Sequence, residues 1–506
     1  MTPLSWFLIG AAALLAVFFL VFGRKKKDGL DIETSRAART AKAGALGSRL
    51  SWRYLWAKTR ALFAGEEKRK KILDETHLKS AEEVVRFMGN MKGAIMKVGQ
   101  IVSFLSDDVP EQYRAVLKQL QTQSPPMSFD LARGVIEKEL STPLKTLFKD
   151  IDEKPLAAAS IGQVHRAQLP DGKDVVIKIQ YPGVDQAIRA DLSNLNWMYA
   201  MMGMLNPGLD PKPLVQELKE RIGEELDYRL EARNQETFVA LYGGHPFIRV
   251  PKIVPSHSAS RVLTQEFISG KNYDWLLKQP EAFRSQVSEV LYRFVFGSIA
   301  RFRVFNGDPH PGNYLFHENG SVTFLDYGCI KYFPEGMLAG WKDLIRAHIE
   351  GDREKFRRHI TELEFIQPGA KGTTEQFYDY FGYFYEPFSK DRLFAFTPEY
   401  NAKSLGLVFD RNHPEYGALI KELNMPPDFA LVNRIQWGVY SIFAQLRASG
   451  NWHRIWREYY YDEPPTTELG RKSSTFRAAW KNERGIPPDA SVWMEPGGIK
   501  WEKKAA

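Results

Sequence analysis

The chain has 506 residues, a net charge of +8, and apolar and charged fractions of 44% and 26%. This length predicts two or more lobes with a large core, and the composition is that of a globular protein. The Lys and Arg residues are scattered, which argues against a nucleic-acid-binding protein and suits a surface near anionic lipid. The single cysteine, Cys329, excludes an internal disulfide framework and indicates a reducing compartment.

The N-terminus carries an uncharged apolar run at residues 3–22, followed at once by Arg24 and three lysines. About 20 such residues cross a bilayer as a helix. Because the positive residues follow the run, they predict that the bulk of the protein lies in the cytoplasm. A cleaved signal peptide has the reverse order. We therefore expect one uncleaved membrane anchor, with a buried core helix as the alternative.

Residues 29–75 are polar and include an aromatic patch that could lie on a membrane surface or pack on the main domain. Residues 76–122 are predicted to be helical, because apolar residues recur there at steps of three and four. Lys97 and Gln100 are three residues apart and lie on another face of that helix. A further helix is expected from Ser128 to Leu140.

The pattern then changes to strands. Residues 163–169 and 173–180 flank Pro170-Asp171-Gly172, which predicts a hairpin. Helices are expected over 185–205 and 211–242, and a second strand pair over 249–254 and 261–267. A helix over 280–305, a small hairpin around Glu318-Asn319-Gly320, and helices from about 336 to 460 follow. The tail from Asp462 onward contains Pro464-Pro465 and Pro487-Pro488 and is expected to be extended or partly disordered.

Phosphoryl-transfer chemistry is indicated by Asp308, Asn313 and Asp326. Asn313 lies five residues after Asp308, and Asp326 opens an Asp-Tyr-Gly sequence. One carboxylate can orient or deprotonate an acceptor, while an amide oxygen and a second carboxylate hold Mg²⁺ on nucleotide phosphates. A lone Asp and Asn pair is usually only part of a loop, so the interpretation depends on the rest of the chain.

Two further features suit a nucleotide. The segment Ala157-Ala158-Ala159-Ser160-Ile161-Gly162-Gln163-Val164 precedes the first hairpin strand, where backbone amides can cover phosphates. Its alanines narrow the backbone conformations that glycine would allow, and alone the segment is more typical of a helix start. Lys178 lies on the second strand and could contact phosphates if a carboxylate such as Glu225 holds it; alone, it would be a solvated lysine.

Taken together, these motifs resemble the UbiB/AarF/ADCK family of atypical, protein-kinase-like proteins. The resemblance rests on six motifs in family order, over residues 80–450: Lys97-Val98-Gly99-Gln100, the Ala-rich loop 157–164, Val176-Ile177-Lys178, Glu225-Leu226-Asp227, Gly307-Asp308-Pro309-His310-Pro311-Gly312-Asn313, and Asp326-Tyr327-Gly328.

The resemblance implies an α+β, two-lobed, protein-kinase-like fold. It divides the chain into the anchor and its basic flank (1–28), a polar linker (29–75), a helical extension (76–150), a β-rich lobe (151–270), a helical lobe (271–460) and an extended tail (461–506).

The resemblance also implies roles for individual residues. Lys178 would pair with Glu225 and contact the phosphates, Asp308 would be the catalytic carboxylate, and Asn313 and Asp326 would hold Mg²⁺. The Ala-rich loop would lie over the phosphates of ATP or ADP. The backbone of Glu266, Phe267 and Ile268 would contact adenine. Lys97, Gly99 and Gln100 would belong to an extension that covers the protein-substrate groove, which Asp227 would help to hold.

The sequence departs from the family pattern at several positions. Asn306 stands where the family usually has His, which puts the rigidity of the catalytic loop in question more than its activity. Tyr327 replaces the Phe of protein kinases, and Gln265 lies where an apolar residue is common. The predicted membrane segment is N-terminal, whereas many bacterial relatives carry theirs at the C-terminus.

These features predict a membrane-anchored, Mg²⁺-dependent ATP-binding kinase or ATPase that supports the synthesis or handling of ubiquinone or another isoprenoid lipid. Its expected partners are a nucleotide, membrane lipid or quinone intermediates, and biosynthetic enzymes at the membrane, and no nucleic acid. A non-catalytic nucleotide-binding scaffold and a small-molecule kinase are the alternatives.

Overall fold

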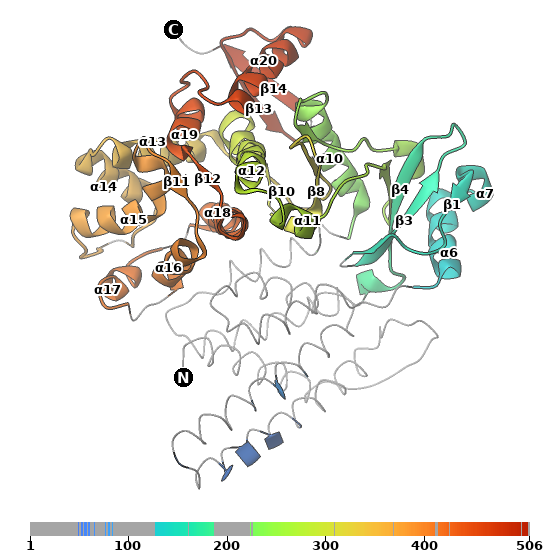
Figure 1. Cartoon of the computed structure of the whole chain (residues 1–506), viewed down its shortest axis with the longest axis horizontal. Coiled ribbons are helices and arrows are strands. Elements are labelled where there is room, and N and C mark those ends of the chain that lie inside the picture. The colour runs from blue at the N-terminus through green and yellow to red at the C-terminus, as the bar shows by residue number, and fades with distance from the viewer. Residues whose placement is uncertain are drawn as a thin grey trace. The chain divides into compact units, whose positions relative to one another are not determined.

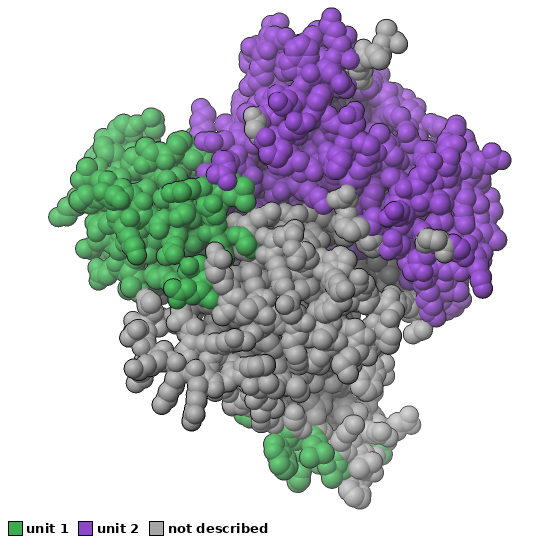
Figure 2. Space-filling view, turned by 180° about the vertical axis from the view of Figure 1, so that it is seen from behind, with its two compact units in different colours: residues 1–230, 253–267 green, residues 231–252, 268–506 purple. Residues whose placement is uncertain are grey.

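The chain divides into two compact units, shown in different colours in Figure 2. Unit 1 comprises residues 1–230 and 253–267, and unit 2 comprises residues 231–252 and 268–506. The computed structural model describes residues 127–159, 161–186, 226–307, 309–367, 369–409, 413–424, 426–496 and 498–503, with Gly223 and isolated positions between 49 and 83.

The predicted membrane anchor is not upheld. Across the described ranges no helix has both the length and the apolar character needed to span a bilayer. Residues 3–22 themselves lie outside the described residues. So do residues 84–122 and 187–222, which hold most of the helices predicted over 76–122 and 185–205 and the first part of the helix predicted over 211–242.

Unit 1 is built around an antiparallel sheet. Its described helices are α6 (Phe129–Leu140), α7 (Leu144–Leu147) and the short 3₁₀ helix η2 (Pro255–His257). Its strands are β1 (Asp150–Ile151), β2 (Ala157–Ala158), β3 (Gly162–Gln168), β4 (Asp174–Gln180) and β6 (Val262–Glu266).

Within the described residues these strands form one sheet in the order β1-β3-β4-β6, with β2 also paired to β3. The hairpin predicted around Pro170-Asp171-Gly172 is confirmed, since Gln168 pairs with Asp174 and Gly172 has a φ of 88° that suits glycine. The predicted helix beginning near Ser128 is also confirmed, because the Ser128 hydroxyl accepts a hydrogen bond from the Leu131 amide and caps α6. α6 contacts β4 and β6 and buries Ala132 and Ile136.

Unit 2 is mainly helical, with short strands between the helices (Figure 1). The helices are α10 (Tyr228–Tyr242, whose first turn belongs to unit 1), α11 (Tyr273–Leu277), α12 (Glu281–Phe302), η3 (Pro311–Asn313), α13 (Glu335–Ile349), α14 (Arg353–Glu362), α15 (Thr374–Ser389), α16 (Pro398–Phe409), α17 (Gly417–Ile420), α18 (Pro427–Leu446), α19 (Trp452–Tyr460) and α20 (Glu468–Glu483). The strands are β5 (Ile248–Arg249), β7 (Val304–Asn306), β8 (Tyr314–Phe316), β9 (Val322–Phe324), β10 (Ile330–Tyr332), β11 (Phe394–Ala395), β12 (Ser449–Gly450), β13 (Ala490–Glu495) and β14 (Gly498–Lys503).

The core of unit 2 forms around α12, which is buried on nearly every side from Val287 onward. A helix that is apolar all round belongs in a protein interior. It contacts α18, α19, β7, β9 and β13. The helix ends at Arg303, whose left-handed backbone stops it before β7, so the predicted helix over 280–305 was slightly too long.

The predicted pairing of strands 249–254 and 261–267 was wrong, because each of the observed strands has another main partner. β5 pairs in parallel with β9 of unit 2, whereas β6 pairs with β4 of unit 1. The chain leading into β6 keeps two isolated antiparallel bridges, Ile253 with Gln265 and Ala259 with Val262, and the Val254 amide donates to the Thr264 carbonyl at 2.8 Å. Pro251 has no N–H to donate to a ladder, and its carbonyl accepts a hydrogen bond from the Gln235 side chain instead.

The C-terminal tail is also more regular than predicted. It forms α20 and the β13–β14 hairpin, drawn in red in Figure 1. Thr467 caps α20 by accepting a hydrogen bond from the Gly470 amide, and Leu469 and Trp480 bury their side chains. In β13, Ala490, Val492 and Met494 are buried in alternation. This apolar burial outweighs the prolines that suggested an extended tail.

Candidate nucleotide site

Lys178 lies in the middle of the unit 1 sheet, on β4 between Val164 of β3 and Leu263 of β6. Its neighbours Ile177 and Ile179 are buried, while Lys178 itself is half-buried. The ammonium lies 5.0 Å from the ring centroid of Tyr228, at the start of α10. An aromatic face stabilises a cation at this distance. Tyr228 was not among the predicted site residues, although its place directly after Glu225-Leu226-Asp227 could have suggested it.

The Ala-rich loop is a tight hairpin and not a helix start. β2 pairs with β3 so that Ala157 faces Val164 and Ala158 faces Gln163, and Ala159 and Gly162 exchange backbone hydrogen bonds. The methyl groups of Ala157 and Ala158 are exposed, as a surface over a ligand requires.

Gly162 is fixed by a close approach of backbone. A Cβ atom there would lie 2.2 Å from the Ile179 carbonyl oxygen of the next strand, so only glycine fits. The neighbouring Ile161 and Gln163 are buried. The Gln163 side chain accepts from the Met127 amide at 2.9 Å and lies 2.8 Å from His165 Nε2. The predicted site residues Ile161 and Gln163 are therefore buried and support the loop from the protein interior.

The crossover predicted to contact adenine follows β6. Glu266 is exposed at the end of that strand, and Phe267 and Ile268 are half-buried. The Phe267 amide donates to the Asp174 carbonyl at 3.1 Å, and the Arg166 guanidinium lies 4.4 Å from the Phe267 ring centroid. The segment is thus an ordered, partly accessible stretch of backbone.

In unit 2 the β8–β9 hairpin brings Asn313 and Asp326 to one end. Tyr314 pairs with Phe324, and the Leu325 amide donates to the Asn313 carbonyl at 2.9 Å. Asn313 and Asp326 flank these positions, and both are half-buried. Their predicted proximity therefore follows from the register of the hairpin. An Asp326 carboxylate oxygen, Oδ1, accepts from the Gly328 amide at 2.9 Å.

The backbone before Asn313 is held by its own short-range contacts. His310 Nδ1 accepts from the Gly312 amide at 2.9 Å, and the Asn313 amide donates to the His310 carbonyl at 2.9 Å. His310 thereby caps η3 and sets the position of Asn313. The motif around His310 does not by itself predict this capping role.

Asn306 replaces the usual histidine without loss of a hydrogen-bond donor. It is 7% exposed, and its side-chain Nδ2 donates to the backbone carbonyl of Asp326. β7 and β10 place Asn306 opposite Ile330, and the Gly307 amide donates to the Cys329 carbonyl at 2.7 Å. Asn306 therefore fixes β7 to the Asp-Tyr-Gly segment.

Tyr327 anchors Asp326 from the core side. Its ring is fully buried against Phe238 of α10, and its carbonyl accepts from the Asn234 side chain at 3.0 Å. Burial raises the pKa of the Tyr327 hydroxyl well above its ordinary value, with smaller contributions from nearby tyrosines and Asp326. The phenol stays neutral and acts as a packing group, as the Phe of protein kinases does.

Several predicted residues lie outside the described part of the chain: Asp308, Glu225, Ser160, Lys97, Gly99 and Gln100. Asp227 is described, and its side chain accepts from the Arg229 amide at 3.0 Å at the start of α10. Its role in holding the extension stays a prediction.

The donor set suits Mg²⁺. No group of three or more His, Cys, Asp or Glu side chains that could hold a metal occurs among the described residues. Mg²⁺, however, is typically held by one or two protein oxygens together with phosphates and water. The Asn313 amide oxygen and the Asp326 carboxylate, at one end of a hairpin, are such a pair.

Comparisons with known proteins agree with this arrangement. The ABC1 atypical kinase-like domain matches residues 119–360. The rat "Atypical kinase COQ8B, mitochondrial" is 32% identical over 289 residues, which are 57% of this chain and 55% of that protein. The yeast "Atypical kinase COQ8, mitochondrial" from Saccharomyces cerevisiae is 27% identical over 396 residues, which are 77% of each chain.

A solved structure, the complex of Rv3197 with erythromycin from Mycobacterium tuberculosis, is also similar. It is 31% identical, with a TM-score of 0.58, and the match covers 78% of this chain and all of that one. Relatives named as mitochondrial or chloroplastic also depart from the cytoplasmic location that the sequence predicted. The ordered motifs, the mixed α and β content and these matches show that the chain belongs to the UbiB/AarF/ADCK family of atypical kinase-like proteins.

Proposed function

We propose that this protein binds ATP or ADP with Mg²⁺ and acts as an atypical kinase or ATPase. The observation that carries the proposal is the β8–β9 register, which brings the oxygen donors of Asn313 and Asp326 to one hairpin end. Lys178, half-buried on a rigid strand beside Tyr228, supports it as the cation for the phosphates.

The chemistry required of these residues is mainly positioning and charge stabilisation. When bound, Mg²⁺ would neutralise charge that develops on the phosphates. Asn313 and Asp326 would hold it through their side-chain oxygens, and Asn306 keeps the Asp326 backbone in place. Lys178 supplies a second positive charge. Asp308, by family resemblance, is the carboxylate that orients the acceptor hydroxyl or water.

The main test is Mg²⁺-dependent ATP turnover by the full chain, compared with Asp326→Asn. The substitution removes the negative charge and keeps the side-chain size, so turnover should fall by about 100-fold or more. Asp489→Asn, on an exposed surface of unit 2, is the matched control and should retain wild-type turnover. Equal rates in wild type and Asp326→Asn would favour the alternative, a non-catalytic nucleotide-binding scaffold.

The Ala-rich loop offers a second test. Ala159 closes the tight turn with Gly162, and glycine at position 159 would widen the backbone conformations open to the turn. Ala159→Gly should therefore change the ratio of ATP to ADP affinity, measured by titration calorimetry. An unchanged ratio would count against a phosphate-covering role for the loop.

We further propose that this activity supports the synthesis or handling of ubiquinone or another isoprenoid lipid, with lipid or quinone intermediates and biosynthetic enzymes as partners. The family membership supports this proposal, as does the name COQ8 of two relatives. Quinone and lipid profiles of a strain lacking the protein should be restored by wild type and not by Asp326→Asn. Equal rescue by both proteins would show that the lipid role does not depend on ATP chemistry.

A further inference from the structure

A small cavity lies inside unit 2, away from the β8–β9 hairpin end. Its volume is about 20 Å³, and its walls come from α10, β5, α12, α19, α20 and the turn after α10. Its polar lining includes His245, Arg293, Arg301, Tyr459, Ser473 and Arg477. Tyr242 also lines it, with its hydroxyl hydrogen-bonded to the Ser298 hydroxyl at 2.6 Å. None of these residues entered the proposed nucleotide chemistry. Three arginines around so small a space require an account of their counter-charges.

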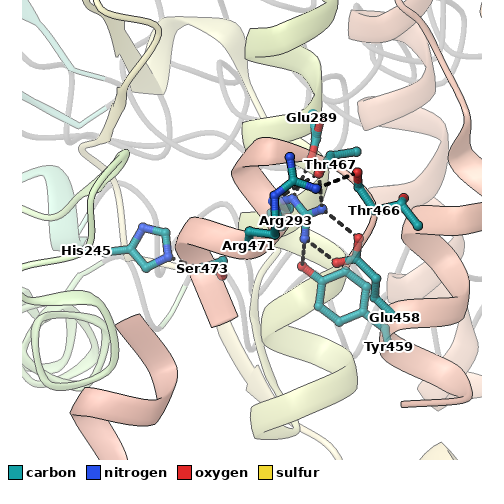
Figure 3. A network of polar contacts seen from close by, with 10 residues as sticks. His245, Glu289, Arg293, Glu458, Tyr459, Thr466, Thr467, Arg471 and Ser473 are labelled. Atoms are coloured by element: carbon teal, nitrogen blue, oxygen red, sulfur yellow. Dashed lines mark hydrogen bonds and ion pairs between the residues drawn. The ribbon is translucent and has the colours of Figure 1, made fainter. Parts of the chain in front are cut away.

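Arg293 is neutralised by the carboxylates beside it (Figure 3). Its Nη1 and Nη2 donate to the two oxygens of Glu458 at 2.7 and 3.1 Å, and its Nε donates to Glu289 at 2.7 Å. Glu289 also accepts from the Thr467 hydroxyl at 2.5 Å. These two carboxylates are therefore committed to Arg293 and to the cap of α20.

His245 and Ser473 add a hydrogen-bond donor to the cavity. The Ile248 amide donates to His245 Nδ1 at 3.2 Å, so that nitrogen is an acceptor and Nε2 carries the hydrogen. His245 Nε2 then donates to the Ser473 hydroxyl oxygen at 3.4 Å (Figure 3). Ser473 keeps its own O–H to donate. Burial, followed by Arg293 and Arg301, lowers the pKa of His245 to about 3, so the ring is neutral.

Tyr459 can also donate a hydrogen bond into the cavity, because its hydroxyl oxygen already accepts one. Its hydroxyl oxygen accepts from Arg293 Nη1 at 3.4 Å, which leaves the O–H available. Gly297 of α12 permits this approach, because a Cβ there would lie 2.9 Å from the Tyr459 hydroxyl oxygen.

Among the described residues, Arg301 and Arg477 have no matching acceptor. Arg301 lies 4.3 Å over the Tyr459 ring, yet its buried Nε has no hydrogen-bond partner in the described ranges. The structure gives Arg477 no hydrogen bond to any described residue. Burial lowers its pKa to about 10, Arg301 lowers it further, and Tyr459, Asp462 and Glu458 act on it only as nearby charges in the opposite direction.

The cavity is thus lined by donors, and its volume allows one water molecule or one ion of similar size. A water molecule would need acceptors for its own two hydrogens, whereas an anion needs only donors. We propose that the cavity binds one small monovalent anion of chloride size, held by the Arg301 and Arg477 guanidinium groups and the Ser473 hydroxyl. Phosphate and sulfate are too large for it.

Such an anion would connect α12 to α20, since Arg301 lies on the first helix and Ser473 and Arg477 lie on the second. Docking of the C-terminal helix then depends on the anion. A ligand that binds only the folded state raises stability with its concentration.

The test is thermal unfolding of the full chain in sodium chloride and in sodium gluconate at constant ionic strength. The midpoint should rise by about 1 to 3 °C for each tenfold increase in chloride, once the site is more than half occupied, and gluconate should have no such effect. Arg477→Met should abolish the chloride response. Lys472→Met, which removes an exposed charge from the same helix, should keep it.

If Arg477→Met does not fold, crystals of the wild type grown in bromide decide the question. An anomalous bromide peak between Arg301 and Arg477 would support the proposal. Equal unfolding midpoints in chloride and gluconate, or a cavity without bromide, would overturn it. A chloride response lost equally in Lys472→Met would also overturn it, because the effect would then be general screening.

Discussion

Two polar regions of unit 2 are built in opposite ways. At the β8–β9 hairpin end, Asn313 is fixed through its backbone amide and carbonyl, and its side chain and that of Asp326 are half-buried. At the junction of α12, α19 and α20, Arg293 and Glu458 are almost fully buried and satisfy each other. The first arrangement keeps polar side chains near solvent, where a ligand can meet them. The second uses charge to join distant parts of the chain.

The largest predicted effect is on stability, from the second region. Arg293→Met leaves the Glu458 carboxylate buried without its partner, so the free energy of unfolding should fall by about 3–5 kcal/mol. Denaturant unfolding followed by circular dichroism measures this. Arg358→Met is the control, since its pair with Glu362 is exposed and is worth less than about 1 kcal/mol.

The comparison between the regions would break if Arg293→Met lost less than about 1 kcal/mol. It would be sharpened if the folded fraction of Arg293→Met retained wild-type nucleotide affinity, because the two regions would then be energetically separate.

The next effect is a loss of stability in acid, also from the second region. His245 is neutral in the fold, and its pKa falls from 6.5 in the unfolded chain to about 3. Above pH 6.5 both states are neutral and His245 contributes no pH dependence. Below pH 6.5 the unfolded state binds a proton that the fold excludes, so stability falls, by up to about 2 kcal/mol at pH 5.

Unfolding midpoints in urea, measured from pH 7.5 to pH 4.5, test this prediction. His245→Asn should flatten the curve, because its amide oxygen can still accept from the Ile248 amide without titrating. Part of the slope will remain, since burial also lowers the pKa of His348 to about 4. Parallel curves for the variant and the wild type would show that His245 does not cause the slope.

The sequence predicted the first region well because its signals are local. Gly320, with a φ of 79°, marks the turn of the β8–β9 hairpin, as Gly172 marks that of β3–β4. Once the turn is placed, the register brings Asn313 and Asp326 to one end. The spacing of the motifs therefore contained most of the geometry of this half of the candidate site.

The second region could not be predicted because its contacts join residues far apart in the sequence. Arg293 meets Thr467 and Glu458, and each pair is separated by more than 160 positions. The prolines before α20 suggested an extended tail, and only tertiary packing of Leu469 and Trp480 reveals the helix. The parallel pairing of β5 with β9 is non-local in the same way.

The smallest predicted stability effect concerns Asn306, which shares a feature with each of the two regions. It is buried as in the second region, yet its amide holds the backbone of a proposed metal ligand in the first. Asn306→Ala leaves the Asp326 carbonyl without this donor and should lower the free energy of unfolding by about 1–2 kcal/mol. Turnover at saturating Mg-ATP should fall by about tenfold or more, because Asp326 would no longer be held in position.

Asn306→His supplies a ring N–H in place of the amide and should recover most of the turnover. A purely structural role would instead give equal stability losses in Ala and His variants, with turnover per folded molecule unchanged in both. That result would detach Asn306 from the ATP chemistry. Recovery by His alone would show that one buried hydrogen bond connects the stability of β7 and β10 to the position of Asp326.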